Sequence, residues 1–429
     1  MSVDSGEADR YRDLARRLHD VAKPMRVLSA LRWSPEVRED FLARGASRLP
    51  DVSYEPFDAA PIIDEIRSIR RSIFPGSLID DWFESQAASV EQTALMLAAR
   101  GTPSFLTHSA ALYGVPTAPL RYDPITPLEL AHRVGEVIGD LGRIGLDLLP
   151  TPDRDAASVA AEVEQGVRAH FGADAPKVEV VDELSANALA TSTRIKLRNG
   201  ALFTDRDAAQ LLNHEGYIHV LTSINGRHQP DLPILAVGHP GTTRTQEGLA
   251  VFAEFITGTL ELDRIRRLAD RVLAVRMVIE GADFIELYRW FLERTPTPEQ
   301  AFESTRRVFR GGPVTGGAPF TKDVVYLSGF LAVSTFIRAA FVRDRVDCLG
   351  LLFAGKLDIF AIPALCELRA LGLCQPARHR PPWVMDPRWV LTWLTVSTFT
   401  QAIDLDSVAA AIGRLLDRAP VVPIAVPTN

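Results

Sequence analysis

The stretch LLNHEGYIH, residues 211–219, decides how this 429-residue chain is interpreted. It contains His214, Glu215 and His219 in the pattern H-E-x-x-x-H, and the whole chain has only nine histidines. Neutral imidazoles are preferred zinc ligands, and a glutamate between them can take a proton from metal-bound water. The stretch therefore predicts a zinc site of the kind found in zinc peptidases, with one residue more than the usual spacing between the histidines.

The spacing sets a condition on the helix that the sequence predicts over residues 204–226. Positions i and i+4 of an α-helix differ by about 40° around the axis, but i and i+5 differ by about 140°. A regular helix would therefore point His214 and His219 apart, as two unrelated surface histidines. A one-turn π-bulge with an i→i+5 hydrogen bond brings them onto one face, and Gly216 eases it because glycine weakens helix propensity. We predict such a local widening.

A third metal ligand is expected from the helix predicted for TTRTQEGLAVFAEFITG, residues 242–258. Catalytic zinc normally has three protein ligands and one open position. Glu247 and Glu254 are seven residues apart and share one helix face among apolar neighbours, where an unpaired carboxylate is costly. We expect one carboxylate to bind the metal and the other to bond an imidazole. The alternative is a solvated helix face, which suits Glu254 better than Glu247.

Helix signals dominate the remainder of the chain. Ser89, Thr126 and Thr297 each stand three residues before Gln or Glu, the spacing of a helix-capping box. After residue 203 the pattern is helical to the C-terminus, except for two loops rich in Pro and Gly at residues 225–245 and 311–320.

Strand signals are few and short. KVEVV at 177–181 and RIKLR at 194–198 alternate, and residues 201–203 are expected as a third strand after an Asn-Gly turn. A small sheet therefore precedes the helix with the two histidines, and the fold class is α+β with helix in excess. We predict a helical N-terminal lobe, 1–175, and a second lobe, 176–429, that holds the sheet and the motifs.

Composition and charge narrow the classes of function. Apolar residues make up 47% of the chain and charged residues 24%, typical of a globular protein. The net charge of −7 argues against a nucleic-acid partner. The N-terminus lacks the apolar core of a signal peptide, and the apolar segments 324–337 and 389–403 are shorter than a bilayer-spanning helix. Three cysteines without CxxC spacing predict a reducing compartment, so we expect a cytoplasmic protein with no membrane partner.

Several phrases along the chain, taken in order, resemble one known family. They are GTPSF (101–105), ALYGVP (111–116), HEGYIH (214–219), NGRHQP (225–230), TQEGLAVFAE (245–254) and PFTKDVVYLSG (319–329). The family is that of the flavohaemoglobin expression-modulating QEGLA motif proteins, relatives of the animal microtubule-associated tyrosine carboxypeptidases. The resemblance covers most of the chain.

The resemblance implies a zincin-like metallopeptidase core with one Zn²⁺ per chain. It implies His214, His219 and Glu247 as metal ligands and Glu215 as general base, which leaves Glu254 as the carboxylate beside an imidazole. The implied substrate is the C-terminus of a peptide or protein, with an aromatic or other bulky residue as leaving group. Nothing here looks like a microtubule-binding extension, so tubulin is not carried over as the substrate.

The chemistry of peptide hydrolysis needs two further groups. A donor must stabilise the tetrahedral oxyanion, and Tyr326, His228 and Arg244 are available in the motif segments. A carboxypeptidase also needs a cation for the terminal carboxylate of its substrate. Lysine is scarce, with five in the chain, so the lysines of the motif and strand segments stand out. The candidates for this cation are Lys322, Lys196, Arg194, Arg198 and Arg244.

Two other functions remain open. The same core could belong to a zinc endopeptidase or an aminopeptidase. The protein could instead be a non-catalytic regulator whose metal is structural. A regulator has no need of a glutamate between the two histidines, so Glu215 favours an enzyme.

Overall fold

The computed structural model describes residues 5–142, 152–182, 184, 187–191, 193–400 and 404–418. They belong to two compact units, Met1–Pro382 and Trp383–Asn429, and the first contains all the motifs. Helix predominates and the strands are few, so the predicted α+β class with helix in excess is confirmed. The predicted lobe boundary at residue 175 stays a prediction, and elements from both sides of it pack around the helix of the H-E-x-x-x-H motif.

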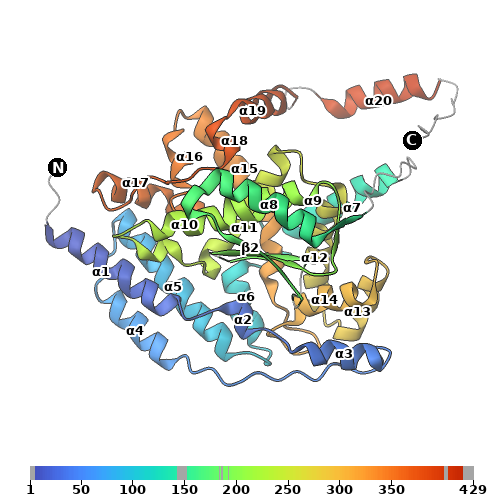
Figure 1. The fold of residues 1–429 in the computed structure, drawn as a ribbon, viewed down its shortest axis with the longest axis horizontal. Coiled ribbons are helices and arrows are strands. Elements are labelled where there is room, and N and C mark those ends of the chain that lie inside the picture. Colours follow the sequence, from blue (N-terminus) through green and yellow to red (C-terminus); the bar gives the residue numbers. More distant parts are fainter. Residues whose placement is uncertain are drawn as a thin grey trace. The chain divides into compact units, whose positions relative to one another are not determined.

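In the N-terminal part of the first unit, the described regular elements before residue 143 are all helices (Figure 1). The capping prediction is confirmed at Thr126, which exchanges hydrogen bonds with Glu129, and at Thr297. It is wrong at Ser89, which lies inside a long helix capped by Ser77, because the apolar pattern extends further upstream. The helices are α1 (Ser5–Ala22), α2 (Val27–Ala30), α3 (Pro35–Ala43), α4 (Ala60–Arg70), α5 (Leu78–Ala98), α6 (Phe105–Tyr113) and α7 (Pro127–Gly142).

Two small sheets follow. The strands and helices of this part are β1 (Arg154–Asp155), α8 (Ala156–Phe171), η1 (Gly172–Asp174), β2 (Lys177–Val181), β3 (Ala188–Ala190), β4 (Arg194–Arg198) and β5 (Leu202–Phe203). β4 is the centre of one sheet, parallel to β2 and antiparallel to β3. The third strand predicted within residues 201–203 is confirmed as β5, but it does not join β4, whose two edges are occupied by β2 and β3; β5 pairs with β1 instead.

The two motif helices come next. The first is continuous through α9 (Asp207–Leu211), the π-helix η2 (Leu212–Val220) and α10 (Leu221–Arg227). After η3 (Pro233–Ala236), the second motif helix is α11 (Pro240–Ile256). The loop between them is therefore shorter than the predicted 225–245. Asn225 continues the helix because its amide is buried and hydrogen-bonded, donating to the carbonyls of Phe353 and His379.

The remaining helices follow along the chain. In the first unit they are α12 (Leu262–Ile279), α13 (Phe284–Leu292), α14 (Pro298–Phe309), η4 (Thr321–Val324), α15 (Val325–Val342), α16 (Asp347–Leu351), η5 (Ile359–Ala361) and α17 (Ile362–Ala370). α18 (Pro382–Met385) begins at the boundary, and the second unit holds α19 (Arg388–Thr400) and α20 (Leu405–Leu416).

α11 and α15 pack closely against one another beside the motifs. A Cβ added to Gly248 of α11 would lie 2.3 Å from the carbonyl oxygen of Gly329 on α15. Conversely, a Cβ on Gly329 would lie 2.3 Å from the carbonyl oxygen of Arg244. Both positions therefore need glycine, and the contact brings the PFTKDVVYLSG segment against the QEGLA segment.

The apolar helix that contains α15 is longer than the sequence predicted. Thr321–Val342 is long and apolar enough to cross a membrane by length and composition. Half of this segment is buried inside the protein, where it packs against α11. A core helix satisfies the same test, and this packing is what positions the site.

The contact between α11 and α15 can be tested with two Gly-to-Ala substitutions. We expect Gly248→Ala to lower the free energy of unfolding by about 1–3 kcal/mol, because backbone atoms cannot yield to the added methyl group. Gly135→Ala in α7 is the control: nothing lies within 4 Å of its added Cβ, so a gain of about 0.5–1 kcal/mol is expected. Chemical denaturation measures the free energy of unfolding of both variants. Equal values for Gly248→Ala and Gly135→Ala would contradict the close contact between α11 and α15.

Candidate metal centre

The helix of the H-E-x-x-x-H motif is widened where the sequence predicts it. Leu212–Val220 is a π-helix, continuous with α-helix on both sides. Inside it, His214 and His219 turn toward one another, with ring centroids 4.9 Å apart and planes inclined by 81°. The predicted widening is therefore confirmed, and it removes the angular mismatch of a five-residue spacing.

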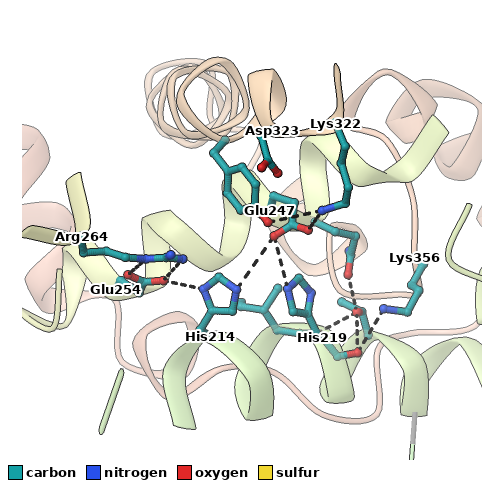
Figure 2. A network of polar contacts seen from close by, with 12 residues as sticks. His214, His219, Glu247, Glu254, Arg264, Lys322, Asp323 and Lys356 are labelled. Carbon is teal, nitrogen blue, oxygen red and sulfur yellow. Dashed lines mark hydrogen bonds and ion pairs between the residues drawn. The ribbon is translucent and has the colours of Figure 1, made fainter. Parts of the chain in front are cut away.

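Glu247 completes a group of three metal-binding side chains. Its Oε2 lies 3.7 Å from Nε2 of His219 and 4.0 Å from Nε2 of His214. The three ligand atoms all lie within 4.8 Å of one another, as Figure 2 shows with the two imidazoles below the carboxylate. Two imidazole nitrogens and one carboxylate oxygen are a donor set of catalytic zinc sites. These residues fit a metal ion of that kind.

The orientation of His214 is fixed by Glu254. Nδ1 of His214 lies 2.5 Å from Oε1 of Glu254, so Nε2 is the ring nitrogen that faces Glu247. Arg264 donates to both oxygens of Glu254 at 3.3 Å. Burial raises the pKa of Glu254, but Arg264 and His214 outweigh it and hold the pKa at about 2. The buried carboxylate is thus ionised and paired on two sides.

Glu247 is held from the opposite side by Lys322. The ammonium of Lys322 donates to Oε1 of Glu247 at 2.6 Å, which leaves Oε2 toward the imidazoles. Burial raises the pKa of Glu247, but Lys322 and the two imidazoles lower it well below its ordinary value. Lys322 also donates to the hydroxyl of Tyr326 at 3.3 Å. The Lys322 ammonium, one of the predicted substrate-binding groups, is thus bonded to the third side chain of the cluster.

Tyr326 lies between two cations. Its hydroxyl accepts a second hydrogen bond, of 2.8 Å, from Arg307, which is also paired with the buried carboxylate of Asp323. Because both of these bonds use the oxygen as acceptor, the hydroxyl proton stays free to be donated. Tyr326 therefore has a free O–H group, which an oxyanion donor requires.

Glu215 and Lys356 lie close to the cluster. Within the described residues, the Glu215 carboxylate has no hydrogen bond or ion pair, yet it is near enough to raise the pKa values of His214 and Lys356. Lys356 donates from Nζ to the backbone carbonyl of His219 at 3.2 Å. Burial lowers the pKa of Lys356 to about 8, although Glu247 and Glu215 raise it. Figure 2 places Lys356 beside His219.

The three candidates on strand β4 lie apart from this cluster. Arg194 forms an ion pair with Glu179 at 3.2 Å, and Arg198 donates to the side-chain carbonyl of Asn187 at 2.8 Å. Lys196 stands between them in the register of the sheet. In the part of the chain that the structure describes, no hydrogen bond or ion pair joins these side chains to the histidines or to Glu247.

The remaining two candidates are in the motif helices. Arg244 lies in α11, one turn before Glu247, and its buried Nε has no hydrogen-bond partner among the described residues. His228 follows α10 and is bonded on both ring nitrogens, to the carbonyl of Ile224 at 2.9 Å and to Arg378 at 2.6 Å. Both ring nitrogens of His228 are therefore used in contacts within the protein, whereas the Nε–H of Arg244 is free to donate a hydrogen bond among the described residues.

The sequence reasoning missed Arg307, the partner of Tyr326, and also Arg264 and Lys356. Arg264, the partner of Glu254, belongs to α12, and nothing distinguishes it from the many other arginines of the chain. Lys356 could have been selected by the scarcity of lysine, but it belongs to none of the quoted motifs. All three reach the site through tertiary packing rather than through local spacing.

Comparison with known proteins agrees with this geometry. The family model described as microtubule-associated tyrosine carboxypeptidase matches residues 39–402. That range includes every residue of the cluster and most of the chain, so the resemblance drawn from the motifs is confirmed. No curated protein matches the sequence. The chain belongs to the microtubule-associated tyrosine carboxypeptidase family.

Proposed function

We propose that this protein is a zinc-dependent carboxypeptidase that removes the C-terminal residue of a peptide or protein. The family supplies a carboxypeptidase-like peptidase fold. The single observation that carries the proposal further is the convergence of His214, His219 and Glu247, whose ligand atoms lie within 4.8 Å of one another. A structural zinc site is usually closed by four protein ligands, whereas three leave a position for water or substrate.

We assign the metal to His214, His219 and Glu247, one ion per chain. The anionic form of Glu247 is the protonation state that a metal requires, and the Nε2 atoms of both imidazoles face its carboxylate. When bound, zinc would polarise the scissile carbonyl and lower the pKa of the attacking water. Glu254 keeps His214 in the correct orientation by accepting its Nδ1–H.

Proton transfer and stabilisation of the oxyanion are carried out by side chains of the protein. Glu215 accepts a proton from the attacking water and passes it to the leaving amine. Its lack of other hydrogen bonds in the described chain leaves both oxygens able to do so. Tyr326 donates its hydroxyl proton to the developing oxyanion, while Lys322 and Arg307 hold the hydroxyl oxygen in place.

For the terminal carboxylate of the substrate we favour Lys356 over the cations expected from the sequence. Lys322 is committed to Glu247, and Arg194 to Glu179. Lys356 has no ion pair among the described residues, is only half-buried, and lies close to both Glu215 and Glu247. A cation beside the general base suits a substrate whose scissile bond is the last one of its chain.

Two alternatives predict different behaviour. A zinc endopeptidase would use the same metal and base but would not need a cation for a terminal carboxylate. A non-catalytic regulator would bind metal without any need for Glu215. The following tests separate these functions.

The metal assignment is tested by elemental analysis of purified variants. We expect one zinc per chain in the wild-type protein and in Glu215→Gln, and none in His214→Ala, because only the latter removes a ligand. Glu215→Gln should lose peptide hydrolysis because it lacks the base. His228→Ala serves as the histidine control and should keep its zinc. Full zinc in His214→Ala would rule out this ligand set.

The positioning role of Glu254 is tested by Glu254→Gln. We expect zinc affinity to fall about 10- to 100-fold, because the imidazole loses its carboxylate partner. The folded-state pKa of Glu254 is about 2, below its ordinary 4.5, so its ionisation stabilises the fold fully above pH 4.5 and progressively less toward pH 2. The stability difference between wild type and variant should therefore narrow as the pH is lowered from 5 toward 3.

Chelator titration and urea unfolding of the metal-free protein give these two quantities. Glu280→Gln is the matched control, since this carboxylate forms an exposed ion pair with Arg276. It should leave both zinc affinity and stability almost unchanged. A Glu254→Gln variant that behaved like this control would show that the carboxylate does not position His214.

Exopeptidase specificity is tested with one peptide in two forms, as the free acid and as the C-terminal amide. We expect kcat/KM for the amide to be about 10- to 100-fold lower, because a charge-assisted contact to the carboxylate is lost. In Lys356→Met the ratio of kcat/KM between the free acid and the amide should fall to near unity, because KM for the free acid rises. In Lys196→Met, a lysine of β4, the ratio should remain high.

Each other outcome of the peptide experiment has a definite meaning. Equal cleavage of both peptide forms by the wild-type protein would indicate an endopeptidase. Absence of cleavage with one zinc bound would favour the regulator. A retained acid preference in Lys356→Met would move the carboxylate contact to another cation of the site.

A further inference from the structure

A second cluster of reactive side chains lies outside the metal centre. Cys348 in α16 and Cys366 in α17 place their Sγ atoms 4.0 Å apart. Both thiols are free, and they are the nearest pair among the chain's three cysteines, all of which are described. A disulfide bond needs about 2.05 Å, so side-chain rotation and a small approach of the two helices would join them.

Arg345 stands over both sulfur atoms. One guanidinium nitrogen lies 3.0 Å from Sγ of Cys348 and 3.8 Å from Sγ of Cys366, and the same group is paired with Asp347. A nearby cation favours a thiolate, the reactive form of cysteine, although at Cys348 burial and the neighbouring Cys366 and Asp347 outweigh the effect of Arg345 on the pKa. The same positive charge opposes a metal ion, although Asp347 and the two cysteines would otherwise offer three ligands.

The segment between the two cysteines is attached to both motif helices. The side chain of Asn225 donates to the carbonyl of Phe353, and Gln229 donates to that of Ala354. Lys356 donates to the carbonyl of His219. Through these contacts, residues 349–365 hold the helix that carries both histidines.

The same segment also holds α11. The Thr245 hydroxyl, two residues before Glu247, donates to Asp358 at 3.2 Å and accepts from the amide of Ile359 at 2.9 Å. Residues 349–365 therefore contact the elements that supply all three candidate metal ligands. The two cysteines flank this segment at its ends.

We propose that Cys348 and Cys366 are a redox modification site, in which a hydroperoxide oxidises the two thiols to a reversible disulfide that closes the segment between them. The disulfide bond joins the two ends of segment 349–365, and the middle of this segment is hydrogen-bonded to the helices of the candidate metal ligands. Its formation shrinks the ensemble of the unfolded chain and restrains the segment in the folded one. The expected result is a more stable protein that releases its metal more slowly.

The chemistry is balanced in two steps. The sulfur of Cys366 attacks one oxygen of hydrogen peroxide; the O–O bond breaks, a sulfenic acid forms, and the other oxygen leaves as water with the thiol proton. The sulfur of Cys348 then attacks the sulfur of Cys366; the S–O bond breaks, and the hydroxyl leaves as water with the second thiol proton. Two thiols lose two electrons in total, and one peroxide becomes two waters.

The order of the steps follows from exposure. Cys366 is partly exposed, whereas Cys348 is buried. Burial, and then the neighbouring Cys366 and Asp347, raise the pKa of Cys348 to about 11. Cys366 is therefore the thiol that meets peroxide first, and Cys348 is the thiol that resolves the sulfenic acid.

The test uses the full-length, zinc-loaded protein treated with hydrogen peroxide and then with dithiothreitol. Intact mass and peptide mapping should show the loss of two hydrogen atoms and a Cys348–Cys366 cross-link, both reversed by the reductant. The melting temperature should rise by about 5 °C on oxidation. Zinc release to a chelator should slow several-fold. Cys374→Ser, which removes the third cysteine, should behave like wild type, and Cys366→Ser should show none of these changes.

Three results would overturn the proposal. The first is oxidation of Cys366 to sulfinic acid without a cross-link. The second is a cross-link that leaves the melting temperature unchanged. The third is the loss of a bound metal ion in Cys366→Ser, which would make the cluster a metal site. The mass and melting measurements do not depend on peptidase activity, so failure of the proposed function would leave this test intact.

Discussion

The widened turn between His214 and His219 is the constraint on which the rest of the site depends. π-helical hydrogen bonding is less favourable than α-helical bonding, so the surroundings must stabilise it. The carbonyl of His219 accepts hydrogen bonds from Ser223 at 2.9 Å and from Lys356 at 3.2 Å. Gly216 fits closely against Leu212, so the turn is also packed tightly. Polar contacts at its C-terminal end thus offset the cost of holding both imidazoles on one face.

Charge pairing then sets the protonation states of the site. Reading across Figure 2, Arg264 pairs with Glu254, Glu254 bonds His214, and Glu247 pairs with Lys322. Each buried carboxylate has a cation, which prevents it from being protonated. The consequence is that Glu247 can bind a cation without first losing a proton, whereas the raised pKa of His214 means that a metal ion must compete with a proton for this imidazole. The arginine and the lysine act on the metal site although neither is a ligand.

Local patterns in the sequence predicted most of this site, and tertiary pairing accounts for what they missed. Histidine spacing predicted the widened turn, and the seven-residue spacing of Glu247 and Glu254 placed both carboxylates toward the histidines. The pairing of β5 with β1 was missed because strands of two or three residues carry almost no periodicity. Arg264 and Lys356 were missed because no spacing within their own helix or loop relates them to a histidine.

The QEGLA segment shows why a motif can be specific without each residue being catalytic. Only Glu247 reaches the metal-binding group. Gln246 accepts a hydrogen bond of 2.8 Å from Thr222 of α10, which ties α11 to the helix of the histidines. Gly248 has no side chain and so lets the backbone of α15 pack against α11, and Leu249 and Ala250 are fully buried. Four of the five positions therefore fix where the helix lies, and the position of the helix fixes where one carboxylate oxygen lies relative to two imidazoles.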